Sequence, residues 1–345
     1  MRTIERPNPC QALQGSARQT HDGLCQASTP NSASWLPTLI AASISAVVAA
    51  VIIAPFTAIA VAAAGLSFPF PRIFDRTVMV TAFAALLLFA RRLKLLELLR
   101  RGFTTERIGI WQAFGGLALA SGAVGVLFTL AAVAGGSLRG SAIGASVLGY
   151  LPAAVLIAII EEGFFRAFLL AGIEGEYGSA GGLLASSAIF ALVHVIRSPA
   201  HFYVVQFDPL AGAKTLAAYV ERMFALEVGA PLLGFFLLGI VLGEAFVLTR
   251  RVHCSVGLHV GFVLGAKTWR LAVSGAIPRW LAGPGAVPLV AAPAAWAISA
   301  VVLVVLSLWL GQRGPLAHPQ PLAQSPSARI RGNNAERGAG TGRVA

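Results

Sequence analysis

The chain has 345 residues, of which 57% are hydrophobic and only 12% are charged, and its mean hydropathy is +0.77. Soluble domains carry about 25% charged residues, so the composition excludes an ordinary soluble protein and indicates a polytopic membrane protein. The net charge of +12 does not indicate nucleic-acid binding. The basic residues lie in short loops and tails between apolar runs, where topology and anionic lipid headgroups explain them.

A bilayer core about 30 Å thick requires roughly 20 apolar residues per helix. The sequence therefore predicts an all-α polytopic membrane protein with about eight transmembrane helices and an intramembrane polar site. The second and seventh of these helices are short. The predicted spans are Trp35–Leu66, Thr77–Ala90, Ile110–Leu138, Ala142–Gly172, Tyr177–Ile196, Val228–Leu248, Val252–Ala266 and Ala286–Leu310. Residues 1–35 and 312–345 are polar and lack an apolar core of their own, so we expect them to be disordered tails.

The distribution of Lys and Arg predicts the orientation. Six basic residues lie in the segment 91–107, which should therefore be cytoplasmic. Alternation from this segment places both tails on the same side, with 17 of the 26 basic residues inside. We expect a multi-pass protein of the cell inner membrane with both tails in the cytoplasm.

Two adjacent glutamates, Glu161 and Glu162, end a charge-free run that begins at Gly140. Ionisable groups inside membrane segments usually face an interior cavity, have a partner and mark a functional site. Arg166 lies four residues after Glu162, which places the two on one helix face in the favourable orientation for an ion pair. Glu161 lies about 100° round the helix, and this pairing leaves it available for chemistry.

Two histidines lie inside other apolar runs. His194 ends the segment Phe190-Ala-Leu-Val-His194, and His259 lies between Gly257 and Gly261, which permit close approach of helix backbones. A lone membrane histidine is commonly an interhelical hydrogen-bonding group. One carboxylate and two imidazoles on three helices can instead polarise a water, either as a metal triad or as a general-base constellation.

Other intramembrane proteases are excluded by their missing residues. The three aspartates, Asp22, Asp75 and Asp208, lie outside the predicted spans, so an aspartyl protease pair is absent. The sequence also contains no HExxH zinc motif and no GxSG segment.

The motifs resemble those of the CAAX protease and bacteriocin-processing family of intramembrane glutamic or metallo-endopeptidases. Glu161-Glu162-Gly-Phe-Phe-Arg166 matches the family's EExxxR motif, and Phe190 to His194 matches its FxxxH motif. The stretch from Phe235 to His259 is similar to the third and fourth motifs. The resemblance covers roughly residues 145–270, and it departs from the family at Val263, where many members have an asparagine that could donate to an oxyanion.

The resemblance implies an intramembrane CAAX-type endopeptidase that acts on a membrane-associated protein or peptide. It implies catalytic roles for Glu161, His194 and His259, and supporting roles for Glu162, Arg166 and Phe190. The implied domain organisation is N-terminal helices over 36–140, a catalytic core over 141–275 and a last helix within 276–311.

On this reading Glu161 takes a proton from a water that His194 also holds, and His259 stabilises the oxyanion. The water would reach them through a polar cavity between spans four, five and seven, although the predicted topology places His259 nearer the cytoplasm than Glu161. Zinc held by Glu161, His194 and His259 and a metal-free glutamate base both remain open. Two other classes also remain, an inactive scaffold or partner-binding protein of the same fold and a proton-coupled transporter.

Overall fold

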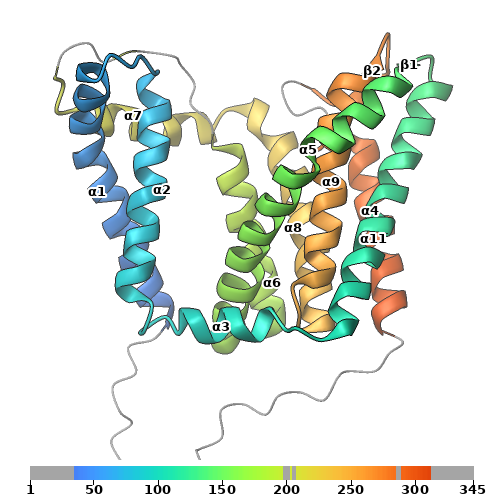
Figure 1. The fold of residues 1–345 in the computed structure, drawn as a ribbon, viewed down its shortest axis with the longest axis horizontal. Coiled ribbons are helices and arrows are strands. Elements are labelled where there is room, and N and C mark those ends of the chain that lie inside the picture. Colours follow the sequence, from blue (N-terminus) through green and yellow to red (C-terminus); the bar gives the residue numbers. More distant parts are fainter. Residues whose placement is uncertain (1–34, 197–202, 204–206, 285–288, 312–345) are drawn as a thin grey trace, which may run out of the picture. The chain divides into compact units, whose positions relative to one another are not determined.

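The structure is a computed structural model that describes residues 35–196, 203, 207–284 and 289–311 (Figure 1). Both predicted disordered tails lie almost entirely outside these ranges. The described elements are helical except for two short strands, which confirms the all-α part of the predicted fold class. The chain forms two compact units, one of residues up to 97 together with 198–220, and one of 98–197 together with the residues from 221 onward.

The smaller unit is built from α1 (Trp35–Ala63), α2 (Phe70–Phe89) and most of α7 (Ala211–Met223). The buried positions of α1 include alanines at every fourth residue from Ala42 to Ala58, whereas large apolar side chains such as Ile44 and Ile52 are exposed. Small residues inside and large apolar residues outside are typical of a helix that packs against a neighbour and faces lipid. The short helix α3 (Leu95–Gly102) crosses the boundary between the units in sequence.

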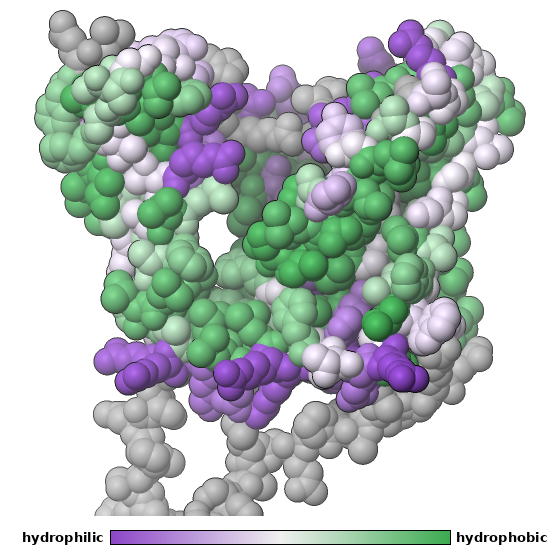
Figure 2. Space-filling model, viewed as in Figure 1, coloured by the Kyte–Doolittle hydropathy of each residue, from purple (hydrophilic) through white to green (hydrophobic). Residues whose placement is uncertain are grey.

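The larger unit is a bundle of long helices. It contains α4 (Arg107–Val133), α5 (Gly140–Glu162), the π-helix η1 (Gly163–Leu170), α6 (Ala171–Val195), the 3₁₀ turn η2 (Leu226–Val228), α8 (Gly229–Thr249), α9 (His253–Ala272), α10 (Arg279–Ala282) and α11 (Pro293–Gly311). The strands β1 (Ser137–Leu138) and β2 (Val273–Ser274) pair antiparallel, with Ser137 opposite Ser274. This pairing joins the ends of α4 and α9. On the visible face of this unit, hydrophobic residues cover most of the surface (Figure 2).

Five helical stretches of the described chain are long and apolar enough to cross a membrane. They are Trp35–Ala63, Arg107–Val133, Ile143–Val195, Leu226–Thr249 and Pro293–Gly311. The protein is therefore an integral membrane protein, but the predicted count of eight spans is not confirmed. The second and seventh predicted spans, corresponding to α2 and α9, fail this criterion. The fourth and fifth fall within the single stretch from Ile143 to Val195.

A chain reversal at Gly178 divides that stretch. Gly178 has φ 74° and ψ 172° inside α6, a backbone conformation that is almost restricted to glycine. After it the chain runs back along itself, since a Cβ on Gly182 would lie 3.0 Å from the carbonyl oxygen of Leu170. Glu161 and His194 lie 17 residues before and 16 residues after Gly178. Because the two residues are almost equally far from the reversal, they lie at a similar distance from it along the two helical segments.

Close backbone contact fixes α9 against α4. A Cβ on Gly257 would lie 1.9 Å from the carbonyl oxygen of Ala113, and one on Gly116 would lie 2.4 Å from the carbonyl oxygen of Cys254. Only glycine fits at such positions. This contact confirms the close approach predicted for Gly257, and it sets the position of His259 one half-turn further along α9.

Replacement of Gly178 by alanine should destabilise the protein by about 1–3 kcal/mol, because the reversal requires a glycine-only backbone conformation. Gly175→Ala is the matched control. Gly175 lies in the same helix with no atom within 4 Å of an added Cβ, so this change should be neutral or slightly stabilising. Thermal melting in detergent measures both variants, and equal melting temperatures would contradict the role assigned to Gly178.

Candidate functional site

Glu161 and Glu162 are the last two residues of α5, and the π-helix η1 follows them directly. π-helical turns are rare and occur frequently at functional sites. The sequence-based prediction of the Glu162–Arg166 pair assumed regular α-helical geometry, so the π-helix is a difference that the spacing did not reveal. The ion pair nevertheless forms, with Arg166 Nε 3.3 Å from Glu162 Oε2.

The Glu162 carboxylate is completely buried and lies between two cationic or proton-donating groups. Both Glu162 and Arg166 have 0% side-chain exposure. The other carboxylate oxygen, Oε1, lies 2.8 Å from Nδ1 of His259. The guanidinium of Arg166 also stacks over the Phe190 ring at 5.0 Å. Arg166, Glu162 and His259 thus form one buried chain that connects η1 to α9.

Glu161 meets both histidines with one carboxylate oxygen. Its Oε2 atom lies 3.2 Å from Nε2 of His194 and 3.8 Å from Nε2 of His259. The Glu161 side chain is 28% exposed, in contrast to Glu162. The structure therefore brings together all three residues that the sequence singled out as catalytic candidates, and it places Glu162 and Arg166 directly behind them.

The hydrogen-bond partners indicate which ring nitrogens carry protons. Nδ1 of His194 lies 2.8 Å from the backbone carbonyl oxygen of Phe190, which can only accept. Nδ1 of His259 faces the Glu162 carboxylate, which is also an acceptor while it is ionised. Both Nδ1 atoms must therefore donate, and both Nε2 atoms point toward Glu161. In the neutral tautomers, three acceptor atoms converge at one point.

The position of His259 corrects the predicted topology. From the sequence, the seventh span is predicted as Val252–Ala266, and His259 is predicted to lie nearer the cytoplasm than Glu161. In the structure α9 continues to Ala272, and the contacts of His259 with both glutamates place it at their level. Most residues of α9 are buried against protein, and the extension adds the buried Thr268 and Trp269 together with the exposed Lys267 and Arg270.

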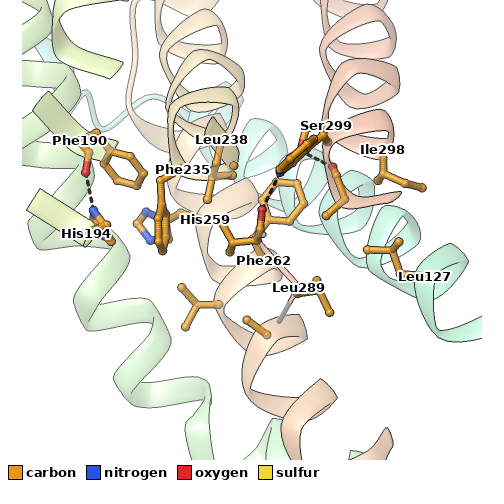
Figure 3. A pocket seen from close by; sticks show the side chains of 16 residues that line it. Leu127, Phe190, His194, Phe235, Leu238, His259, Phe262, Leu289, Ile298 and Ser299 are labelled. Carbon is orange, nitrogen blue, oxygen red and sulfur yellow. Dashed lines mark hydrogen bonds between the residues drawn. The ribbon is translucent and has the colours of Figure 1, made fainter. Parts of the chain in front are cut away.

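An apolar pocket of about 130 Å³ opens beside the two histidines (Figure 3). His194 and Phe190 lie at one end of the pocket, and Leu127, Ile298 and Ser299 lie at the other. The predicted access route was a polar cavity between spans four, five and seven. The pocket is apolar and receives side chains from α4, α6, α8, α9 and α11, so it is not that cavity, which stays a prediction.

Val263 lines this pocket and packs beside Ala154 and Ala158 of α5. Its side chain has no hydrogen-bond donor, so it cannot stabilise an oxyanion. Val263 therefore contributes apolar surface to the pocket wall.

Several residues of the site could not be identified from the sequence. The ring of Phe235 lies 4.9 Å from that of His194, and Trp296 of α11 donates to the backbone oxygen of Val290 on the pocket wall. Phe235 begins the stretch that resembles the third motif, so the resemblance pointed to this part of the chain but not to the contact with His194. No spacing in the sequence points to Trp296 or Ser299, which reach the pocket only through the packing of α11 on α8 and α4.

The residues that would hold a zinc ion, if the protein is a metalloenzyme, are Glu161, His194 and His259. Among the described residues, no group of three or more His, Cys, Asp or Glu side chains is arranged to hold a metal ion. Glu161 Oε2 and His194 Nε2 lie 3.2 Å apart, so that one water molecule could donate to both atoms.

Comparison with known proteins identifies one family. Residues 142–265 match the family described as "Type II CAAX prenyl endopeptidase Rce1-like". The match confirms the resemblance that the motifs indicate, and it contains Glu161, His194 and His259. No curated protein and no solved structure matches the chain.

Loss of either partner of the buried ion pair should destabilise the fold. Glu162→Ala or Arg166→Ala leaves an unpaired charge with no exposure and should cost about 3–5 kcal/mol. Glu161→Gln should leave the melting temperature in detergent nearly unchanged, because Glu161 is partly exposed and outside the pair. If the three variants melt at the same temperature, the division between supporting and reacting glutamates is wrong.

Proposed function

We propose that the protein is an intramembrane endopeptidase that hydrolyses peptide bonds of a membrane-associated protein or peptide. The observation that carries this proposal is the convergence of Glu161 Oε2 with Nε2 of His194 and of His259, beside an apolar pocket. The family match over these residues supports the same reaction class.

Glu161 is the general base of the proposed mechanism. Its Oε2 atom is buried and accepts no hydrogen bond from the described residues. A water at this point can donate one proton to Glu161 and the other to Nε2 of His194, which leaves its lone pairs free to attack a carbonyl carbon. Glu161 takes the proton during the attack and returns it to the leaving amine.

His259 stabilises the oxyanion only when it carries protons on both ring nitrogens, because its Nδ1–H is already committed to Glu162. The buried Glu162 carboxylate stabilises such an imidazolium, and Arg166 keeps that carboxylate ionised. With His259 charged, two carboxylates are balanced by two cations, which limits the cost of placing charge in a low-dielectric site. The supporting pair therefore acts on the reaction through His259.

The apolar pocket is proposed to bind one side chain of the substrate. A cavity of comparable volume lined by apolar side chains binds benzene in an engineered protein, so 130 Å³ corresponds to one leucine- or phenylalanine-sized group. Bonds beside such a residue would be presented to Glu161, and polar side chains would lose hydration without gaining a partner.

Peptidase activity should require Glu161, His194 and His259 together. Purified protein in detergent is incubated with a peptide library, and Glu161→Gln should lower the rate on a verified substrate by about 10²–10⁴-fold. The double variant Glu161→Gln/His194→Ala should be little worse than the poorer single variant, since the two residues share one water. Addition of a chelator should not change the rate.

The control is Glu244→Gln, which removes a half-buried carboxylate of α8 outside the site. It should keep the wild-type rate. If Glu161→Gln retains most of the activity, the catalytic assignment is wrong and the inactive-scaffold alternative gains support. Loss of activity with chelator and recovery with zinc would instead support the metal alternative.

The size of the pocket should set the preferred substrate side chain. Ser299→Leu fills the pocket and should reduce cleavage beside large apolar residues, whereas Ala297→Leu, an exposed position on the same helix, should not. Leu238→Ala enlarges the pocket and should allow cleavage beside tryptophan. This gain cannot result from misfolding. Unchanged preferences in both pocket variants, with activity retained, would reject the pocket assignment but not the peptidase.

A further inference from the structure

A second cavity, of about 500 Å³, lies between α1 and α2 of the smaller unit, and no residue of the proposed site lines it. Its lining combines two arginines, Arg72 and Arg76, with apolar side chains that include Ile53, Val61 and Val80. The volume is within the range of natural ligand pockets. A cavity with cationic and apolar parts fits an amphiphile.

The two arginines are exposed and lie one turn apart on α2. Neither guanidinium forms an ion pair with an acidic side chain in the described part of the chain, and Arg76 donates a hydrogen bond to Met79 Sδ at 3.5 Å. The nearby carboxylate of Asp75 is bonded to the Tyr219 hydroxyl of α7, at 2.6 Å. Like charges at i,i+4 repel one another, so a bound anion would relieve this repulsion.

The rest of the cavity wall is effectively apolar despite its threonines. The hydroxyls of Thr57, Thr77 and Thr81 donate to backbone carbonyls of their own helices at 2.9–3.1 Å. These protons are not available to a ligand. Phe68 and the aliphatic residues named above complete a wall that suits a hydrocarbon chain.

The packing of α7 leaves this cavity unfilled. Ala211 and Tyr219 of α7 pack against a core that includes Ala54, Ala58 and Phe74. The cavity is lined by the neighbouring helix faces, at Ile53, Thr57, Arg76 and Val80 among others. Val61 and Ile73 belong both to the cavity lining and to this core, so the cavity borders the core that α7 packs against, and no residue of α7 lines it.

The cationic end of the cavity lies where a membrane helix would meet lipid headgroups. Arg72 and Arg76 are in the first two turns of α2, and no charged residue occurs from Thr77 to Phe89. Arginine side chains bind phosphate oxygens in bidentate geometry whichever side of the membrane the headgroup lies on. The order of charge and apolar surface along α2 matches that of a phospholipid.

We propose that this cavity binds one anionic phospholipid, with its phosphate between Arg72 and Arg76 and an acyl chain against Ile53, Val61 and Val80. An anionic headgroup is favoured over a zwitterionic one because the two arginines are positive and the lining contains no acidic side chain to receive an ammonium group. This site is independent of the proposed peptidase function.

The test measures lipid retained by the purified full-length protein. The protein is equilibrated with equal amounts of phosphatidylglycerol and phosphatidylcholine in detergent, and the bound lipid is counted by native mass spectrometry. Wild type should retain phosphatidylglycerol selectively. The variant Arg72→Gln/Arg76→Gln should retain at least about tenfold less phosphatidylglycerol than wild type. Arg91→Gln/Arg92→Gln, which removes the same charge outside the cavity, should behave as wild type.

A second pair of variants tests the acyl-chain part without changing any charge. Val80→Trp fills the cavity and should also reduce retention, whereas Leu88→Trp, on the exposed face of the same helix and outside the lining, should not. Free inorganic phosphate should not displace the lipid. The proposal is overturned if the two cavity variants retain as much phosphatidylglycerol as their controls. It is also overturned if wild type retains phosphatidylcholine equally, or if inorganic phosphate alone displaces the lipid.

Discussion

The buried Glu162 carboxylate is the charge around which the site is built. A fully buried carboxylate is costly unless it is paired and hydrogen-bonded, and Glu162 has two compensating groups, Arg166 at 3.3 Å and His259 at 2.8 Å. The first lies one turn along the same chain segment, and the second comes from α9. Satisfying one buried charge therefore fixes the position of α9 relative to the end of α5, and it fixes the ring of His259.

The second constraint is the reversal at Gly178, which brings His194 beside Glu161. The bond from His194 Nδ1 to the backbone of Phe190 then orients the second imidazole. Two unrelated interactions thus give the two histidines the same orientation, with Nε2 toward Glu161. Glu161 itself makes no stabilising ion pair with Arg166 and remains partly exposed, so that the reacting carboxylate and the structural carboxylate are adjacent in sequence but differ in environment.

The reacting residues could be predicted from the sequence because their positions and local spacing along the chain indicate them. The i,i+4 relation of Glu162 and Arg166 and the position of His194 and His259 in apolar runs need no knowledge of the fold. The π-helix, the proton positions and the pocket wall from Trp296 and Ser299 depend on contacts between distant segments, which spacing does not encode. The span count is unconfirmed for a related reason. The helix α9 carries Lys267 and Arg270 and many small residues, and hydropathy alone does not identify a helix that faces mainly protein.

The most direct test of this account is ¹⁵N NMR of the histidine rings in the full-length protein in bilayers at neutral pH. His194→Gln and His259→Gln assign the two signals. The account predicts a proton on Nδ1 of both rings, because the Phe190 carbonyl and the Glu162 carboxylate can only accept. A resting protein in which His194 or His259 carries its proton on Nε2 alone, with Nδ1 bare, would contradict the assignment of both Nδ1 atoms as donors.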